Sequence, residues 1–408
     1  MTSSRPAVAL KRSLPFWLLV LYGLGTTVGA GIYVLVGKVA GAAGMQAPIA
    51  FLAAALLAGT AALAFAELAA RYPLSAGEAA YVDAAFGRPW LTLLVGLAVV
   101  AAGLISSATI TLGFAGYLRA FVDVPPPFAV AGVVVLLGLL AAWGIAESAM
   151  VAAAVTLAEI AALVAVIVAG APALATLPAQ LPEILPPLSA PALGGILTGA
   201  VLAFYAFIGF EDMVNVAEEV HDAPRVLPRA IVTVLAVTTL LYLGVALVAV
   251  LVLPPERLAA SEAPLSAVYA AAGGRGAAVI DLVAIFSVLN GALIQLIMAS
   301  RVLYGLAQRG GLPAWLGRVH PRTRTPVLAT VLVSAICLAL ALLFPIVTLA
   351  RLTAYVALAV FAVVNLALWR LKGRESARPG GFVLPRWVSM AGFAACVAML
   401  AADLMWSA

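Results

Sequence analysis

The sequence predicts an all-α protein that crosses a membrane about eleven times. Hydrophobic residues make up 65% of the 408 residues and charged residues only 10%, whereas an ordinary soluble domain is about 45–50% apolar and about 25% charged. Apolar runs of roughly 20 residues, the length that a helix needs to cross a bilayer, recur along the whole chain. These runs are too continuous for the strands of a membrane barrel. Only helices then satisfy every backbone N–H and C=O group inside lipid.

The runs define eleven spans in a single transmembrane transport domain, residues 1–408. We expect the spans at 15–36, 47–69, 90–120, 128–146, 149–170, 192–217, 230–253, 277–305, 327–344, 347–370 and 383–404. The connections at 171–191 and 254–276 have room for short helices but not for a separate domain. The first five spans, about 15–170, and the next five, about 192–370, form two sets, and an additional helix at about 383–404 follows them.

The basic residues predict the direction of the spans. If the N-terminus is cytoplasmic, all but five of the 22 Lys and Arg residues fall on the cytoplasmic side, the five being Lys38, Arg119, Arg257, Arg275 and Arg351. Cytoplasmic loops carry such an excess. We therefore expect a multi-pass protein of the plasma or inner membrane, with a cytoplasmic N-terminus and an extracytoplasmic C-terminus. The net charge of +5 then reports orientation and implies no nucleic-acid partner.

The first span has small residues at its centre, where residues 25–31 read Gly-Thr-Thr-Val-Gly-Ala-Gly. A glycine costs about 1 kcal/mol relative to alanine inside a helix. The cluster therefore marks either an opening of the helix or a very close helix contact. On this segment alone, packing through Gly25 and Gly29 is as good an interpretation as an opening.

The sixth span contains a glycine and two carboxylates about halfway along, at Gly209, Glu211 and Asp212. An ionisable group at that depth is expensive and normally faces a cavity or a partner, so we interpret these acids as functional. The alternative is that they lie nearer the cytoplasmic end and are simply solvated. Neighbours on a helix point about 100° apart, so at most one of the two acids is expected to face a substrate pocket.

The two interruptions fall in the first helix of each set of five. Corresponding breaks in two successive sets are typical of transporters built from inverted repeats, with the substrate near the middle of the bilayer. A broken helix offers N–H groups and a positive dipole end to a carboxylate, and C=O groups to an ammonium. The pattern therefore predicts a secondary active transporter of a zwitterion, an amino acid or a related amine.

Several motifs together resemble the amino acid–polyamine–organocation (APC) superfamily of permeases, including its cationic amino acid transporter-like and basic amino acid antiporter-like branches. They run in order over about residues 14–370, at 25–32, 66–73, 207–211, 217–220, 228–230, 300–304 and 311–313. The resemblance implies a leucine-transporter-type fold of five plus five inverted helices, with helices 1 and 6 discontinuous. It implies a transporter and no enzyme activity. We expect no cofactor and no metal.

The resemblance also implies where the substrate binds. By position, the residues expected at the substrate's carboxylate end are Thr26, Gly29, Ala30 and Gly31, and those expected on the other side are Tyr205, Phe207, Ile208 and Gly209. Tyr205 stands where the arginine–agmatine antiporter has a tryptophan that stacks on the substrate, although these aromatic residues could instead be core. Glu211 matches an acid of that antiporter associated with gating and proton sensing. Asp212 and Asn290, a polar residue in the middle of the eighth span, are candidate polar groups of the cavity.

Two features depart from the family pattern. Glu159 falls where the cationic amino acid transporter-like branch often has a lysine, whose ammonium is thought to stand in for sodium. A carboxyl group at this depth is a second candidate for proton coupling, although it could pair with a hydroxyl or bind sodium directly. The chain also has eleven spans where relatives commonly have twelve, which puts in doubt any homodimer contact made by the missing helix.

Other classes of function fit less well. A channel needs polar residues repeated along several helices, whereas here they concentrate at two interruptions. An enzyme would need a catalytic or nucleotide-binding motif that the sequence does not carry, and His221 and His320 have no metal-ligand spacing around them. Among transporters, we favour proton-coupled uptake of amino acids, with an amino acid/polyamine exchanger and a sodium-coupled symporter as alternatives. The expected partners are the substrate, the coupling ion and the lipid bilayer, and a homodimer with a second copy of the chain is left open.

Overall fold

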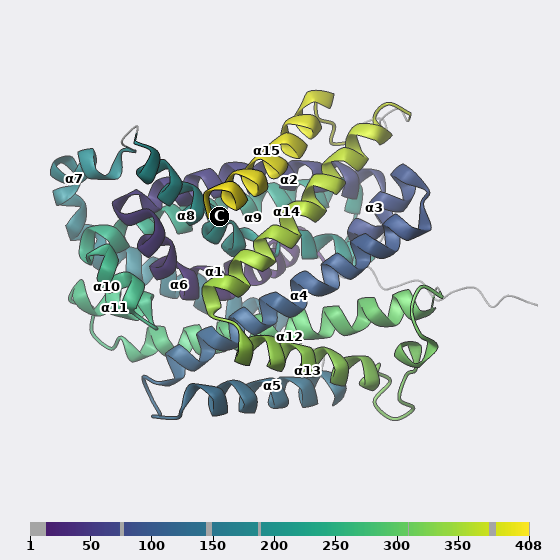
Figure 1. Ribbon diagram of the computed structural model, residues 1–408, viewed down its shortest axis with the longest axis horizontal. Helices are drawn as coiled ribbons and strands as arrows, with labels where there is room; N and C mark the ends of the chain where they lie inside the picture. Colours follow the sequence, from purple (N-terminus) through teal and green to yellow (C-terminus); the bar gives the residue numbers. More distant parts are fainter. Residues whose placement is uncertain are drawn as a thin grey trace, which may run out of the picture.

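The computed structural model describes residues 14–73, 77–143, 149–186, 189–308, 310–374 and 381–407, and within these ranges every regular element is a helix (Figure 1). The long helices are α1 (Phe16–Ala43), α2 (Ala47–Arg71), α4 (Pro89–Leu118), α5 (Pro126–Trp143), α6 (Ala149–Gly170), α8 (Ala190–Phe207), α9 (Ala223–Val252), α12 (Ala278–Gln308), α13 (Val327–Leu343), α14 (Ile346–Leu371) and α15 (Arg386–Ser407). The short ones are α3 (Gly77–Phe86), α7 (Leu177–Ile184), α10 (Pro255–Ala260), α11 (Pro264–Ala271) and the 3₁₀ helices η1 (Gly44–Gln46), η2 (Ala171–Thr176), η3 (Phe210–Glu219) and η4 (Ala314–Gly317).

Each predicted span overlaps a long helix in this part of the chain. Among the described residues, nine segments are long and apolar enough to cross a membrane; one of them, Phe16–Arg71, holds both α1 and α2, and α13 is a shorter apolar helix. The sixth span is divided between α8 and η3. The long connections contain short helices, η2 and α7 in one and α10 and α11 in the other. Two predicted boundaries are displaced by seven residues: α1 ends at Ala43 instead of residue 36, and α9 begins at Ala223 instead of residue 230.

Proline and glycine fix several of the helix ends. Proline occupies the first or second position of α2, α4, α8 and α9, where its missing N–H would have no helical partner in any case. Gly44 ends α1 with a φ of 59°, a conformation that costs glycine little. The turn from α1 to α2 therefore follows directly from the local sequence.

The helices that carry the interruptions lie at the centre of the bundle. Helix α1 packs against α8, α6 and α9, and α2 packs against α8 and α9. Helix α4 packs against both α12 and α14. Figure 1 shows α5 and α13 side by side along one edge of the molecule and α15 beside α14 along another, while α3 lies at one end and α7, α10 and α11 lie at the opposite end.

The outer faces of the helices are strongly apolar. Leu139 of α5, Leu240 of α9 and Leu343 of α13 are between 63% and 74% exposed. Exposed leucines on so many helices match a lipid surround, in which such side chains need no cover. Some polar side chains are buried inside the bundle, among them Glu67, Ser107 and Asp212.

A buried acid joins three segments at the end of the bundle that carries α3. Glu67 of α2 is fully buried and accepts hydrogen bonds from Arg71 at 2.8 Å, from Lys372 at 2.5 Å and from the backbone N–H of Leu384 at 2.9 Å. Buried charges are tolerated when they are paired and hydrogen-bonded in this way. The network therefore fixes α2 to the end of α14 and to the segment that leads into α15.

Candidate functional site

The break in α1 occurs at Gly29, whose φ of −38° and ψ of −129° leave the helical region. Two residues further on, α1 approaches α8 so closely that a β-carbon at Gly31 would lie 2.5 Å from the Cα atom of Ala206. Only glycine fits there without moving one of the helices. Both interpretations of the glycine cluster therefore apply: the helix opens at Gly29, and it packs closely against α8 at Gly31.

The break in the sixth span has a different geometry. Helix α8 ends at Phe207, Ile208 is extended, and Gly209 has a φ of 129°, which L side chains rarely adopt. A β-carbon at Gly209 would also lie 2.2 Å from the carbonyl oxygen of Thr26. The chain then continues as the 3₁₀ helix η3, so Gly209 is required by both its dihedral angle and its contact with α1.

Side-chain hydroxyls tie the two breaks together. Thr26 of α1 lies with its hydroxyl oxygen 2.9 Å from the carbonyl oxygen of Gly209. Tyr242 of α9 has its hydroxyl oxygen 2.8 Å from the Thr27 carbonyl and 2.9 Å from the Ala206 carbonyl. Backbone groups freed by a break inside a membrane must find partners in the protein, and these hydroxyls supply them.

The space between the two breaks is a cavity, here called the central cavity. It is lined by Thr26, Thr27, Gly29, Gly31, Ser106, Ile110, Tyr205, Ala206, Ile208, Asp212, Gly291, Ile294 and Gln295. These residues come from α1, α4, α8, η3 and α12, with Ile208 between α8 and η3. Small polar groups and aliphatic side chains both line it, and a mixture of this kind is usual in small-molecule sites.

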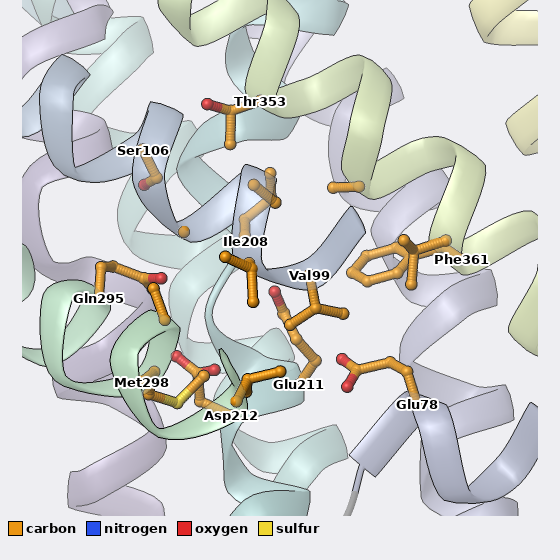
Figure 2. Close-up of a pocket in the computed structure, with 17 residues that line it drawn as sticks. Glu78, Val99, Ser106, Ile208, Glu211, Asp212, Gln295, Met298, Thr353 and Phe361 are labelled. Atoms are coloured by element: carbon orange, nitrogen blue, oxygen red, sulfur yellow. The ribbon is translucent and has the colours of Figure 1, made fainter. Parts of the chain in front are cut away.

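A second cavity adjoins the first on the side of α3, and we call it the acidic cavity. Its polar lining residues are Glu78, Ser106, Glu211, Asp212, Gln295 and Thr353, and most of the others are apolar. Ser106, Ile208, Asp212 and Gln295 line both cavities. Figure 2 shows the carboxyl groups of Glu78, Glu211 and Asp212 around this space, with Gln295 and Met298 on the facing helix α12.

The two neighbouring acids of η3 are buried and not solvated. Glu211 is 9% exposed and Asp212 3% exposed. One carboxylate oxygen of Glu211 accepts a hydrogen bond from the Gly209 N–H at 2.8 Å, which closes the turn at the break. Asp212 reaches the central cavity and Glu211 does not, as the divergence of adjacent side chains predicts, but both reach the acidic cavity.

The structure brings together six of the predicted site residues around the central cavity: Thr26, Gly29, Gly31, Tyr205, Ile208 and Asp212. Phe207 points elsewhere and packs edge-on against Tyr242, with ring centroids 5.0 Å apart, and Gly209 contacts Thr26 beside the cavity. Ala30 lies in α1, but its side chain is outside the described part of the chain. Glu159 and Asn290 line neither cavity; Glu159 is buried in α6, where its backbone oxygen accepts a hydrogen bond from Tyr33.

Five polar residues of the two cavities were not among the predicted site residues: Thr27, Glu78, Ser106, Gln295 and Thr353. The hydroxyl oxygens of Ser106 and Tyr205 are 3.0 Å apart, so Ser106 fixes the ring of Tyr205 at the edge of the central cavity. Gln295 lies one turn of α12 beyond Gly291, which also lines that cavity. Glu78 lies in α3, outside the predicted spans. Burial raises the pKa of Glu78 to about 7. Ser106 and Gln295 are polar residues in the middle of predicted spans, and this position is the sequence signal that could have indicated them.

Within the described ranges, no group of three or more His, Cys, Asp or Glu side chains is arranged to hold a metal ion. The three carboxyl groups of the acidic cavity therefore share a space without converging on one point. Their chemistry is that of separate acids, each of which can hold or release a proton or face a cationic group.

A family model described as amino acid permease matches residues 14–406 of the chain. The branched-chain amino acid permease of Bacillus subtilis (strain 168) is 28% identical over 399 residues, 92% of this chain and 84% of that protein. The vacuolar cationic amino acid transporter 4 of Arabidopsis thaliana is 32% identical over 377 residues, 87% of this chain and 62% of that protein. The methylthioribose transporter of Bacillus subtilis (strain 168) is 25% identical over 397 residues, 92% of this chain and 85% of that protein.

Proposed function

Because this chain belongs to the amino acid permease family, we propose that it is a proton-coupled secondary active transporter that moves amino acids across the cell membrane. Members of the family are transporters and not enzymes. The proposal of a secondary active transporter rests mainly on one observation. Two interrupted helices meet at one cavity, where Gly29 and Gly209 depart from helical geometry. We assign the substrate to this central cavity and transport to alternating access around it.

The proposed architecture is a leucine-transporter-type fold. Helices α1, α2, α4, α5 and α6 make the first repeat, and α8 with η3, α9, α12, α13 and α14 make the second, inverted repeat. The breaks in α1 and after α8 support this division, because corresponding interruptions in two sets of helices mark such repeats. Helix α15 lies outside both sets and packs against α14, α2 and α8.

The central cavity offers a different surface to each part of an amino acid. The break at Gly29 gives a carboxylate access to the backbone and the positive end of a half-helix. The carboxylate of Asp212, of which one oxygen is buried without a hydrogen-bond partner, suits the ammonium group. Ile110, Ile208 and Ile294 suit an aliphatic side chain. The proposal is thus an amino acid held at both charged ends, with its side chain against α4 and α12.

A second candidate function is exchange of cationic amino acids or amines. The acidic cavity favours it, because a cation leaving the central cavity on that side would pass Asp212, Glu211 and Glu78. The name of the Arabidopsis relative, a cationic amino acid transporter, points the same way, whereas that of the permease relative refers to branched-chain amino acids. The charge of the transported side chain therefore separates the two candidates.

Proton coupling is assigned to buried carboxyl groups. Glu211 is the first candidate, because it accepts the Gly209 N–H at the break and would change that contact on protonation. Glu159 is the second, buried in α6 against α1. Glu159→Gln is expected to lose gradient-driven accumulation and keep exchange, and full accumulation in that variant would remove Glu159 from the mechanism. A sodium ion held by Glu159 remains the alternative coupling device.

The basic residues assign the orientation. Most of the described Lys and Arg residues between the helices lie at the end of the bundle that carries α3, including Arg71, Arg88, Arg370 and Lys372. That end is accordingly cytoplasmic by the usual excess of positive charge, and the ends of α1, α4 and α6 that meet α10 and η2 face outward. The acidic cavity lies on the cytoplasmic side of the central cavity under this assignment.

The decisive experiment uses purified protein in sodium-free proteoliposomes and a panel of labelled neutral and cationic amino acids and polyamines. Accumulation of one amino acid group only when the proton gradient is directed inward would support the proposed symport and name the substrate class. Flux that depends on unlabelled substrate inside and ignores the gradient would make the protein an exchanger. Accumulation that requires added sodium would overturn proton coupling, and non-saturable flux would overturn the transporter assignment.

A further inference from the structure

The acidic cavity brings together three carboxyl groups from two segments that are distant in the sequence. Glu78 comes from α3, and Glu211 and Asp212 come from η3. All three are 9% exposed or less. Figure 2 shows the carboxyl groups of Glu78 and Glu211 directed toward the same space.

No basic side chain lines this cavity in the described part of the chain. The side chains that face the three acids from α4, α12 and α14 are uncharged, among them Val99, Met298 and Phe361. The ion pairs between described residues include none of these acids, and Tyr81 of α3 is the other titratable group beside Glu78. Three negative charges without a cationic partner would be very costly in such a setting. Some of the three carboxyl groups are therefore protonated.

Asp212 connects this cavity with the central cavity, because its side chain lines both. It is 3% exposed, and its Oδ2 atom is buried with no hydrogen-bond partner. Glu211, by contrast, is held by the Gly209 N–H. A buried carboxylate oxygen without a donor is an acceptor that a proton would satisfy, and it lies between the place of the substrate and Glu78.

Glu78 is the one acid of the three that lies outside the membrane-spanning segments. Helix α3 connects α2 to α4 at the end of the bundle that we assign to the cytoplasm. Burial raises the pKa of Glu78 to about 7, close to the pH of a cytoplasm, whereas an exposed glutamate titrates near 4.3. The pKa of this carboxyl group therefore suits the exchange of protons with the cytoplasm.

We propose that Glu78 is the cytoplasmic proton acceptor of the transporter, which takes the proton from Asp212 or Glu211 across the acidic cavity and passes it to the cytoplasm. In the transfer, an O–H bond of the donor carboxyl breaks and an O–H bond of Glu78 forms, through a bridging water that receives the donor's proton and gives one of its own to Glu78. The donor is left as the carboxylate that begins the next cycle. Glu78 lines the acidic cavity and not the central cavity, so it acts through the two acids of η3. The inference rests on the proton coupling proposed above.

The test compares Glu78→Gln with Asp83→Asn, an exposed acid on the same helix, in sodium-free proteoliposomes. Two quantities are measured: accumulation driven by an inward proton gradient, and exchange of labelled for unlabelled substrate without a gradient. Glu78→Gln is expected to lose accumulation by at least about tenfold and to keep exchange within about twofold of the unmodified protein. Asp83→Asn is expected to keep both.

The outcomes separate this inference from the proposed function. If the unmodified protein does not respond to the gradient, proton coupling fails and Glu78 has no proton to accept. If the unmodified protein and Glu78→Gln accumulate equally, proton coupling stands and the role of Glu78 is overturned. Equal loss of accumulation and exchange in Glu78→Gln would also overturn it, because that result is expected of a purely structural residue.

A second variant keeps the test decisive if Glu78→Gln does not fold. Glu78→Asp retains a carboxyl group but draws it back by one methylene. It is expected to accumulate substrate, with the dependence of the uptake rate on internal pH displaced from a midpoint of about 7. An unchanged midpoint in Glu78→Asp would overturn the assignment of that midpoint to Glu78.

Discussion

The hydroxyl group of Tyr242 in α9 lies 2.8 Å from the carbonyl oxygen of Thr27 in α1. The same hydroxyl oxygen lies 2.9 Å from the carbonyl oxygen of Ala206 in α8. A phenol has one O–H bond, so Tyr242 shares its proton between two carbonyls on two different interrupted helices. One residue of α9 therefore links the breaks on either side of the central cavity.

Tyr242→Phe should slow transport and lower thermal stability. Removing the hydroxyl leaves two buried carbonyl oxygens without this donor, and an unsatisfied buried group costs about 1–3 kcal/mol. We expect a lower unfolding temperature in detergent and a reduced exchange rate in proteoliposomes. Tyr269→Phe, in the connecting helix α11, is the matched control and should alter neither. An exchange rate in Tyr242→Phe equal to that of the unmodified protein would mean that the link plays no part in transport.

Gly31→Ala should disrupt the contact between α1 and α8. The new β-carbon would lie 2.5 Å from the Cα atom of Ala206, so one helix has to move and the central cavity changes shape. Gly132→Ala in α5 makes the same chemical change with nothing within 4 Å of the new atom, and alanine favours a helix by about 1 kcal/mol over glycine. Substrate binding should be lost in the first variant and retained in the second. Equal binding in both variants would contradict the close approach.

The sequence predicted this architecture well because a bilayer imposes a strong constraint on length and polarity. Apolar runs of roughly 20 residues can hardly be anything but helices in lipid, so all eleven predicted spans coincide with helices. The breaks at Gly29 and near Gly209 were predicted for a physical reason too, since glycine clusters and buried acids are costly inside a membrane helix. Two boundaries were less accurate: α1 continues to Ala43, and α9 begins at Ala223, where Pro224 lies in its first turn ahead of the apolar run.

The site was predicted less completely because a cavity depends on how distant helices pack. Gly291 and Gln295 come from α12 and Ser106 from α4, and local sequence does not indicate which face of such a helix meets α1. Phe207, predicted to line the site, instead packs against Tyr242. Glu78 was missed because it lies between spans, where an acid is ordinarily solvated. Its burial follows from the packing of α3 against α4 and α14.

Asp212→Asn should weaken substrate binding more than Glu211→Gln does. Only Asp212 lines the central cavity, so its charge is the one available to the substrate's ammonium, whereas Glu211 faces the acidic cavity and the Gly209 N–H. We expect the apparent affinity to fall by roughly tenfold or more in Asp212→Asn, the size of about 1.4 kcal/mol. Equilibrium binding of labelled substrate at a fixed pH measures this.

Glu211→Gln is expected instead to alter the pH dependence of transport, because its carboxyl group is the proposed site of protonation at the break. The uptake rate as a function of external pH is the relevant measurement. If Glu211→Gln left both affinity and pH dependence unchanged, its role in coupling would be refuted. A greater loss of affinity in Glu211→Gln than in Asp212→Asn would contradict the placement of the two acids.

Glu67→Gln should destabilise the protein more than Lys372→Met. Glu67 pairs with Arg71 and Lys372, which are 8% and 7% exposed, so its loss leaves two buried cations, and breaking a buried pair typically costs about 3–5 kcal/mol. Lys372→Met leaves Glu67 paired with Arg71. The exposed pair of Arg119 and Glu262 gives the control, since Glu262→Gln should cost less than about 1 kcal/mol. Unfolding temperatures in detergent rank the three, and a Glu67→Gln value no lower than that of Glu262→Gln would contradict the network.

Stability should fall as the pH rises from about 4.5 to about 7, in part because of Glu78. Burial raises the pKa of Glu78 from 4.5 to about 7, so the folded state favours the neutral acid. The contribution of Glu78 to the free energy of unfolding is complete below about pH 4.5, where its carboxyl group is protonated in both the folded and the unfolded state. It is lost as the pH rises through about 7. At about 1.4 kcal/mol per pKa unit, the loss is on the order of 3 kcal/mol.

Glu78→Gln stays neutral at every pH and should lack this loss. Its unfolding temperature relative to that of the unmodified protein should therefore rise across the interval and level off above about pH 7. Asp83→Asn, which removes an exposed acid on the same helix, is the control variant. Thermal unfolding in one detergent at several pH values measures all three. Parallel curves for Glu78→Gln and the unmodified protein would mean that Glu78 titrates as an exposed glutamate, because only a buried acid makes the difference between the curves depend on pH in this range.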